Sequence, residues 1–123
     1  MSFLATLPDH LDITVNGRNF QLVHGAPGST TEERIWGRPA ADSRIVLPGD
    51  ATVIIGHTPV VEYLCPDNEE GQYVLSHRLS AKGDFFHVFY GSGFINIDCC
   101  CGYGFSAARL ACLRLDDMAE FYA

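Results

Sequence analysis

The chain has 123 residues, 47% of them hydrophobic, and its 15 Asp and Glu against 8 Lys and Arg give a formal net charge of −7. This length is enough for one globular domain and too short for two, and the hydrophobic fraction excludes intrinsic disorder. Lysine and arginine form no run along the sequence. That distribution argues against a nucleic-acid polymer or an anionic membrane as the main partner, because both attract clustered cations.

The sequence predicts a cytoplasmic protein with reduced thiols. No apolar stretch approaches the roughly 20 residues that a membrane-spanning helix needs. The first residues lack the cationic segment and the long apolar segment of a secretory signal. Of the five cysteines, three are consecutive at positions 99–101, and an odd number with neighbouring members suits a framework of disulfides poorly.

The first predicted element is a β-hairpin over residues 11–23. Apolar and polar residues alternate over 11–15 and again over 19–23, which is the period of a half-buried strand. Between the two runs, Asn16 and Gly17 form the dipeptide that a two-residue type I′ turn prefers, since both of its positions need a positive φ.

A short helix is predicted next, up to residue 36. Two overlapping capping boxes suit its start: Ser29 with Glu32, and Thr30 with Glu33. In each box a hydroxyl accepts a hydrogen bond from the backbone three residues on, and the acidic side chain reaches back. A proline at position 39 limits any continuation of this helix.

The rest of the chain is predicted to be β-rich, with little helix. The β-branched run at 52–55 is typical of a strand that is buried on both faces. Residues 66–71 are polar and acidic and are expected to form a surface loop. Further strands are expected over 85–90, 94–98, 109–115 and 118–122, the last two joined by a turn at Asp116 and Asp117. No internal repeat and no linker interrupts the sequence.

Two predicted strands end in a histidine beside a glycine. His24 follows the strand over 19–23, and His57 follows the strand over 52–55. If these strands are adjacent and parallel, both imidazoles emerge at one edge of the sheet, where they suit Mn, Fe or Zn as ligands. On spacing alone, the alternative remains open that each histidine only bonds its loop backbone. Asp98 is the most plausible additional carboxylate, although a role as turn-former is better supported.

Four segments together resemble a known family. They are Leu-Val-His-Gly at 22–25, Ile-Trp-Gly-Arg at 35–38, Ile-Gly-His-Thr-Pro-Val at 55–60 and Ile-Asn-Ile-Asp-Cys at 95–99. In this order they are similar to the C-terminal half of the calcineurin-like metallophosphoesterases. The resemblance is closest to the bacterial serine/threonine phosphoprotein phosphatase group and its diadenosine-tetraphosphatase relatives, and it extends from residue 11 to residue 122.

The resemblance implies a fold, a reaction and three site residues. The fold is the α/β, αββα metallophosphoesterase sandwich, of which residues 1–123 would be an incomplete, mainly β half. His24 and His57 match the two histidines that bind the second metal of a dinuclear centre, usually Mn or Fe with Zn. Arg38 matches the arginine that holds the phosphate, a role that its planar charged fork suits, although a solvated surface arginine is the alternative. The implied reaction is hydrolysis of a phosphate ester by a metal-bridging hydroxide.

The main departure from the family is the absence of the motifs that supply its carboxylate ligands and its general-acid histidine. The chain begins Met-Ser-Phe-Leu-Ala-Thr-Leu-Pro, which resembles the tail of an interior helix of the full domain. We therefore expect weak or single-metal binding and little hydrolysis by this chain alone, with a complementing N-terminal half needed for activity. The alternatives are a non-catalytic half-domain that self-associates or binds a partner chain, and a metal or nucleotide binder without turnover.

The cysteine segment is a second departure. Cys100 stands where many bacterial relatives have glycine, and a positive φ there would strain it by of order 1 kcal/mol. The loop that follows, which includes Tyr103, is also longer than in those relatives. A zinc site at Cys99 and Cys101 is a minor alternative, because no second pair of cysteines completes it.

Overall fold

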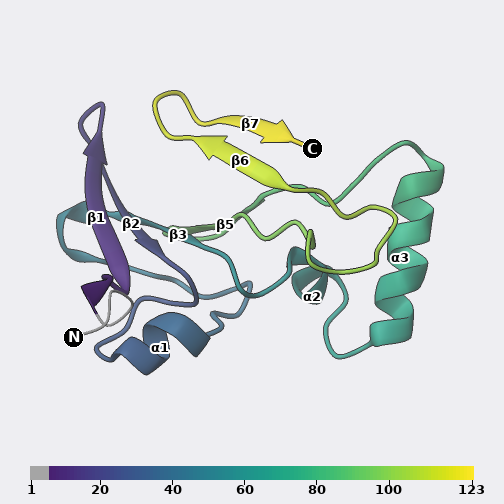
Figure 1. Ribbon diagram of the computed structural model, residues 1–123, viewed down its shortest axis with the longest axis horizontal. Helices are drawn as coiled ribbons and strands as arrows, with labels where there is room; N and C mark the ends of the chain where they lie inside the picture. The colour runs from purple at the N-terminus through teal and green to yellow at the C-terminus, as the bar shows by residue number, and fades with distance from the viewer. Residues whose placement is uncertain (1–5) are drawn as a thin grey trace.

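Residues 6–123 are described by a computed structural model, which has a mixed α/β fold (Figure 1). Its centre is a five-stranded sheet in the order β1-β2-β3-β5-β4. The inner strands β2, β3 and β5 run parallel, while β1 and β4 pair antiparallel at the two edges. The bounds are β1 His10–Val15, β2 Arg18–Val23, β3 Thr52–Ile55, β4 Phe89–Tyr90 and β5 Phe94–Asn96.

The predicted N-terminal hairpin is confirmed. Strands β1 and β2 pair from His10 with Val23 to Val15 with Arg18. The connecting residues Asn16 and Gly17 have φ values of 50° and 78°, as a type I′ turn requires. The antiparallel hairpin therefore forms from local sequence, and it places β2 where β3 can add to it in parallel.

The remaining elements surround this sheet. They are α1 (Thr31–Trp36), a short 3-10 turn η2 (Pro48–Asp50), α2 (Val60–Leu64), α3 (Glu69–Ala81), and a second sheet of β6 (Ala111–Arg114) and β7 (Ala119–Tyr122). Helix α1 is the predicted one. The Thr30 side chain caps it by accepting a hydrogen bond from the Glu33 amide, while the Glu33 carboxylate accepts from the amide of Ser29. Thr30 is therefore the N-cap, as one of the two predicted boxes requires, but the Glu33 side chain bonds the residue before the cap and not the cap itself.

Helix α3 corrects the prediction of little helix and of a loop over 66–71. It begins inside that loop, at Glu69, because the Asn68 side chain accepts a hydrogen bond from the Gly71 amide and two acidic residues occupy the first turn, where the helix dipole favours them. Only Ser76 of its 13 residues is buried. Its apolar contact with the core is limited to the half-buried Leu75 and Leu79, so the hydrophobic period that normally reveals a helix is weak.

The C-terminal strands are shorter than predicted. The strand expected over 85–90 is limited to Phe89–Tyr90, because the Phe86 amide donates to the Ala107 carbonyl and the Val88 amide donates to the Tyr122 hydroxyl. The strand expected over 94–98 ends at Asn96. Tertiary contacts, and not a neighbouring strand, therefore satisfy these backbone groups.

Strand β3 is buried on both faces, as its β-branched run predicts. On one side Ile54 belongs to a cluster to which α2, α3 and the β6–β7 hairpin contribute. On the other side Val53 and Ile55 pack with Phe94, under Leu47 and Tyr63. The two clusters sandwich the parallel centre of the sheet, and this rigid support holds the strand ends that carry the candidate site.

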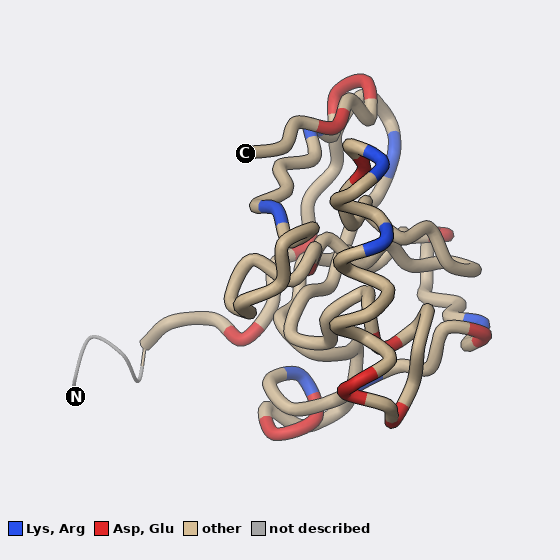
Figure 2. The backbone as a smooth tube through the Cα atoms, turned by 90° about the vertical axis from the view of Figure 1, so that its right-hand side faces the viewer, with Lys and Arg blue, Asp and Glu red and all other residues tan. Residues whose placement is uncertain are grey.

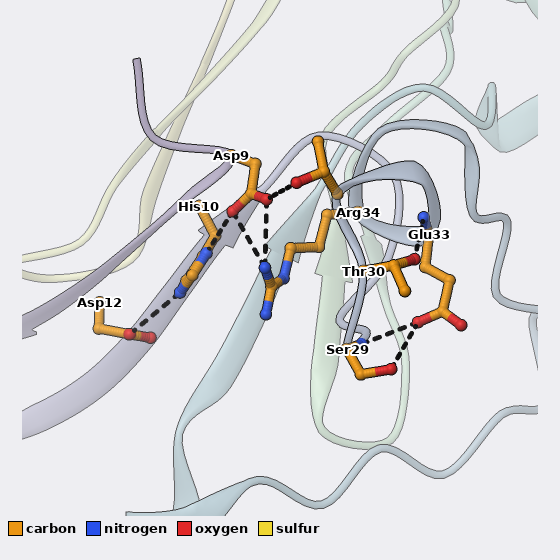
Figure 3. Close-up of polar contacts among 8 residues, drawn as sticks. Asp9, His10, Asp12, Ser29, Thr30, Glu33 and Arg34 are labelled. Atoms are coloured by element: carbon orange, nitrogen blue, oxygen red, sulfur yellow. Dashed lines mark hydrogen bonds and ion pairs between the residues drawn. The ribbon is translucent and has the colours of Figure 1, made fainter. Parts of the chain in front are cut away.

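A polar cluster ties the start of β1 to α1 (Figure 3). The Asp9 carboxylate accepts hydrogen bonds from the Thr31 hydroxyl at 2.6 Å and from the Arg34 guanidinium at 3.1 and 3.3 Å, and it contacts the His10 ring at 2.7 Å. These bonds hold the pKa of Asp9 well below its usual range, with the Thr31 hydrogen bond as the largest cause. Asp9 thereby fixes the position of α1.

Replacing Asp9 by asparagine is expected to remove part of the acid sensitivity of folding. Because the folded-state pKa of Asp9 lies below the unfolded value of 3.8, its stabilisation is present above pH 3.8 and is lost as the pH falls toward the folded pKa. Urea titrations between pH 2 and 6 should therefore show a smaller fall in the free energy of unfolding for Asp9→Asn than for the wild type. Asp12→Asn, at an exposed carboxylate, is the control; equal pH dependence in all three proteins would contradict the role of Asp9.

The charges are scattered over the fold (Figure 2). Blue segments do not gather into one patch in this view, and Arg34, Arg38 and Arg114 each pair with a carboxylate. Among residues 6–123, no helix combines the length and apolar character needed to cross a bilayer. The expectation that the chain begins with the tail of a helix falls mainly on residues 1–5, outside the described residues.

Candidate metal and phosphate site

The two predicted histidines lie side by side at one edge of the sheet. His24 comes directly after β2, and His57 comes two residues after β3. Because β2 and β3 are parallel neighbours, their carboxyl ends meet at the same edge. The two ring centroids are 4.8 Å apart, with the ring planes inclined by 49°. The prediction that both imidazoles emerge together is confirmed.

The backbone holds the two histidine loops together. The Gly56 amide donates a hydrogen bond of 3.0 Å to the His24 carbonyl, so the loops are directly joined. His57 has a φ of 63°, a left-handed conformation that costs a non-glycine residue about 1 kcal/mol. Strained residues of this kind cluster at functional sites, where the surrounding structure maintains them. The position of the His57 ring is thus determined by its surroundings and not by local preference.

A buried amide supports the same edge from β5. Asn96 is 0% exposed; its Nδ2 donates to the Thr58 carbonyl at 2.6 Å, and its Oδ1 accepts from the Asp98 amide at 2.9 Å. One side chain thus links the loop after β3 to the loop after β5. The Asp98 carboxylate in turn accepts a hydrogen bond from the Cys100 amide, so Asp98 acts as the turn-former that the sequence favoured.

The end of α1 is packed directly against the His24 loop. The Gly25 amide donates to the Arg34 carbonyl at 2.7 Å, and a Cβ at Gly25 would lie 2.8 Å from the carbonyl oxygens of Ile35 and Gly37. Only glycine permits this approach. It brings Trp36 to the site, where the indole makes an edge contact with the His57 ring at 5.7 Å between centroids.

Arg38 lies beside the histidines but is already paired. Its Nη1 is 3.3 Å from the Glu62 carboxylate, and 46% of its side chain is exposed. Arg38 and Thr58 help to line a cavity of about 440 Å³. The Thr58 hydroxyl is buried and has no hydrogen-bond partner within residues 6–123. The arginine therefore borders a cavity whose lining includes neither His24 nor His57.

The surroundings favour a neutral His57. Burial lowers the pKa of His57, and the charge of Arg38 and the neighbouring His24 lower it further, against opposing effects of Asp98 and Glu62. A neutral imidazole is the form that binds a metal ion. His57 is therefore available as a ligand at neutral pH.

The spacing of the two rings would allow them to share one cation, and no third ligand from the described residues joins them. In a tetrahedral site with metal–nitrogen bonds of about 2 Å, two ligand nitrogens lie about 3.3 Å apart, a spacing that two rings with centroids 4.8 Å apart can provide. However, no group of three or more His, Cys, Asp or Glu side chains within residues 6–123 is arranged to hold a metal. A dinuclear centre does not fit these residues.

The cysteine segment is a buried turn. Cys99 and Cys100 are buried and Cys101 is exposed, and all five cysteines are free thiols. Burial raises the pKa of Cys99 to about 12 and that of Cys100 to about 11, so neither is a reactive thiolate. Cys100 has a φ of 70°, the positive value that the comparison with glycine anticipated, with its strain of about 1 kcal/mol.

Sequence reasoning missed three residues around the site: Thr58, Glu62 and Asn96. Asn96 was placed within a strand, and its only signal was a buried polar residue among apolar neighbours. Glu62 lies on α2, a helix that was not predicted. No protein-family model, no curated protein and no solved structure matches this chain.

Proposed function

We propose that this chain provides the histidine pair and the phosphate-binding arginine of a metal-dependent phosphoesterase of the calcineurin-like type. The observation that carries the proposal is the adjacency of the His24 and His57 rings at the carboxyl ends of two parallel strands, the edge where α/β sheets bind ligands. Phosphoproteins, small phosphate esters and dinucleoside polyphosphates are the candidate substrates.

Each residue has a defined role in this proposal. His24 and His57 would hold one divalent cation, Mn, Fe or Zn, which when bound supplies Lewis-acid stabilisation of a phosphoryl group. Arg38 would exchange its exposed contact with Glu62 for a charge-assisted contact with phosphate oxygens. Neutral imidazoles bring no negative charge, so the carboxylate ligands needed for hydrolysis would come from a complementing polypeptide, and turnover by residues 6–123 alone would be low.

Metal titration tests the proposal. Calorimetry with Mn²⁺ and with Zn²⁺ is expected to give one binding site per chain, and His24→Ala and His57→Ala are each expected to weaken binding at least 10-fold, because each removes one of two ligands. His77→Ala is the matched control, since His77 is an exposed histidine on α3. No metal binding, or equal binding by all four proteins, would refute the proposal.

A hydrolysis assay separates the chain's own competence from that of an assembled site. With Mn²⁺ and an aryl phosphate, we expect little or no turnover above that of metal in buffer, because a pair of neutral imidazoles leaves the charge of the cation uncompensated. Turnover comparable to that of an intact phosphatase would show that no complementing half is needed. The expectation of weak activity would then be wrong, although the site assignment would stand.

One observation favours a second candidate, a non-catalytic half-domain that binds a partner chain or a second copy. A groove of about 500 Å³ beside His24 has a largely apolar lining that includes Leu11, Leu22, Ile54 and Ile97. Apolar surface of this kind at a sheet is typical of an interaction site. Size-exclusion chromatography distinguishes the two: a concentration-independent monomer would argue against this candidate.

A further inference from the structure

The exposed indole beside the imidazole pair has no role in the function described so far. Trp36 is 66% exposed, although tryptophan usually buries most of its large apolar surface. Its one described ring contact is the edge contact with His57. An edge contact covers little of an indole, so much of the ring remains open to solvent.

The backbone under this indole is fixed. Trp36 is the last residue of α1, and the close approach of Gly25 to the carbonyls of Ile35 and Gly37 anchors this end of the helix on the His24 loop. The Asp9 cluster holds Thr31 and Arg34 of the same helix (Figure 3). A rigidly placed but exposed aromatic ring is what a stacking platform requires, because little conformational entropy is lost when a ligand binds.

The charged group of the site lies next to this ring in the chain. Arg38 follows two residues after Trp36, so their Cα atoms are at most about 7 Å apart. Arg38 also acts electrostatically on His57, the residue whose ring the indole contacts. Both residues thus act on His57, and a ligand with its phosphate at Arg38 and an aromatic ring attached through one sugar could reach the indole.

We propose that Trp36 is a specificity-determining residue that stacks on a planar aromatic ring carried by the phosphate ester. The inference rests on the proposed function, and it narrows the candidate substrates to esters with an aryl or nucleobase group. Stacking of a base on an aromatic side chain tolerates any base, because each base offers a π face. An aliphatic phosphate ester would gain nothing from Trp36.

The test uses the only tryptophan of the chain as its own fluorescent probe. In the presence of Mn²⁺ at a constant concentration, adenosine 5′-monophosphate and ribose 5-phosphate are titrated in parallel, with indole fluorescence and calorimetry as readouts. The wild type is expected to bind the nucleotide roughly 10-fold more tightly than the sugar phosphate, as one stacked base contributes, and to show quenching with the nucleotide.

The variants separate stacking from other effects. Trp36→Ala is expected to bind both ligands with the affinity that the wild type has for ribose 5-phosphate, and Trp36→Phe is expected to keep most of the preference. Phe121→Ala, at a half-exposed aromatic residue on β7, is the control and should keep the full preference for the nucleotide over ribose 5-phosphate. Circular dichroism checks that each variant is folded.

Two failures are distinguishable. Equal affinity of the wild type for both phosphates, or a preference that survives Trp36→Ala, would overturn the role of Trp36 and leave the phosphoesterase proposal intact. Absence of nucleotide binding would also overturn the role of Trp36. If Mn²⁺ binding were absent as well, the histidine site itself would be wrong and both proposals would fall together.

Discussion

Replacing Gly93 by alanine is expected to lower the free energy of unfolding by about 3 to 5 kcal/mol, at the high end of single substitutions. Gly93 has a φ of 82°, and a Cβ there would lie 1.9 Å from the carbonyl oxygen of Ile45. A Cβ and a carbonyl oxygen cannot lie that close, so the segment of Ile45 and the segment of Gly93 must move apart. Their separation would break the hydrogen bonds from the Ile45 amide to Ser92 and from the Val53 amide to Gly93.

Gly83→Ala is the matched control for this prediction. Gly83 also has a positive φ, of 74°, but a Cβ there would meet nothing within 4 Å. Gly83→Ala therefore incurs only the cost of a positive φ at a residue with a Cβ, about 1 kcal/mol. Urea unfolding followed by circular dichroism compares the two variants, and a loss at Gly93 no larger than the loss at Gly83 would show that the approach of the Ile45 carbonyl does not matter.

Replacing Asn96 by leucine is expected to destabilise the fold by about 2 to 4 kcal/mol. Leucine has a similar volume, but it leaves the Thr58 carbonyl and the Asp98 amide without the hydrogen bonds that the buried Asn96 provides. The unfolded chain bonds both groups to water, so the folded state alone incurs the loss. The same change loosens the loop after β3, and metal binding by His57 should weaken as well.

Asn19→Leu is the control for this substitution. Asn19 also makes two hydrogen bonds, with the Thr14 hydroxyl and with the Gly49 carbonyl, but both are solvent-exposed. Water can replace them, and the expected loss is below about 1 kcal/mol. Urea unfolding and calorimetric titration with Mn²⁺ are the two measurements. If Asn96→Leu were as stable as Asn19→Leu, the bridge between the strand-end loops would be unimportant.

These two positions hold different ends of the central strands. Gly93 joins the segment over 44–45 to the sheet, and Asn96 joins the loops after β3 and β5. Neither touches the imidazoles. Gly93 lies where β3 and β5 begin, whereas Asn96 lies where β5 ends and bonds the loop that carries His57. Stability and metal affinity are therefore expected to fall together at Asn96, whereas His24→Ala should affect affinity alone.

Some elements followed from the sequence because their signals are local. The Asn16-Gly17 turn, the Thr30 cap of α1 and the β-branched run of β3 each require only neighbouring residues. The pairing of His24 with His57 was also predictable, but only on the condition that β2 and β3 are parallel neighbours. The resemblance to a phosphoesterase half-domain remains a proposal, which the experiments on metal binding address.

Other features depend on contacts between residues far apart in the chain. Helix α3 buries only a narrow face, so its sequence carries a weak period, and the Asn68 cap with the acidic first turn indicates where it begins. The strand expected over 85–90 is shortened because Phe86 and Val88 bond to Ala107 and Tyr122. Such partners are unknown until the chain has folded.

By itself, the sequence determined the hairpin, the first helix, the buried central strand and the residue types capable of binding a cation and a phosphate, since these depend on backbone preference and side-chain chemistry. Only the tertiary structure decided that the two imidazoles lie 4.8 Å apart, that Glu62 pairs with Arg38, and that Trp36 stands exposed beside them. The physical reason is that each of these relations joins segments that are separate in the chain, whose relative positions are set by strand order and by close packing at Gly25.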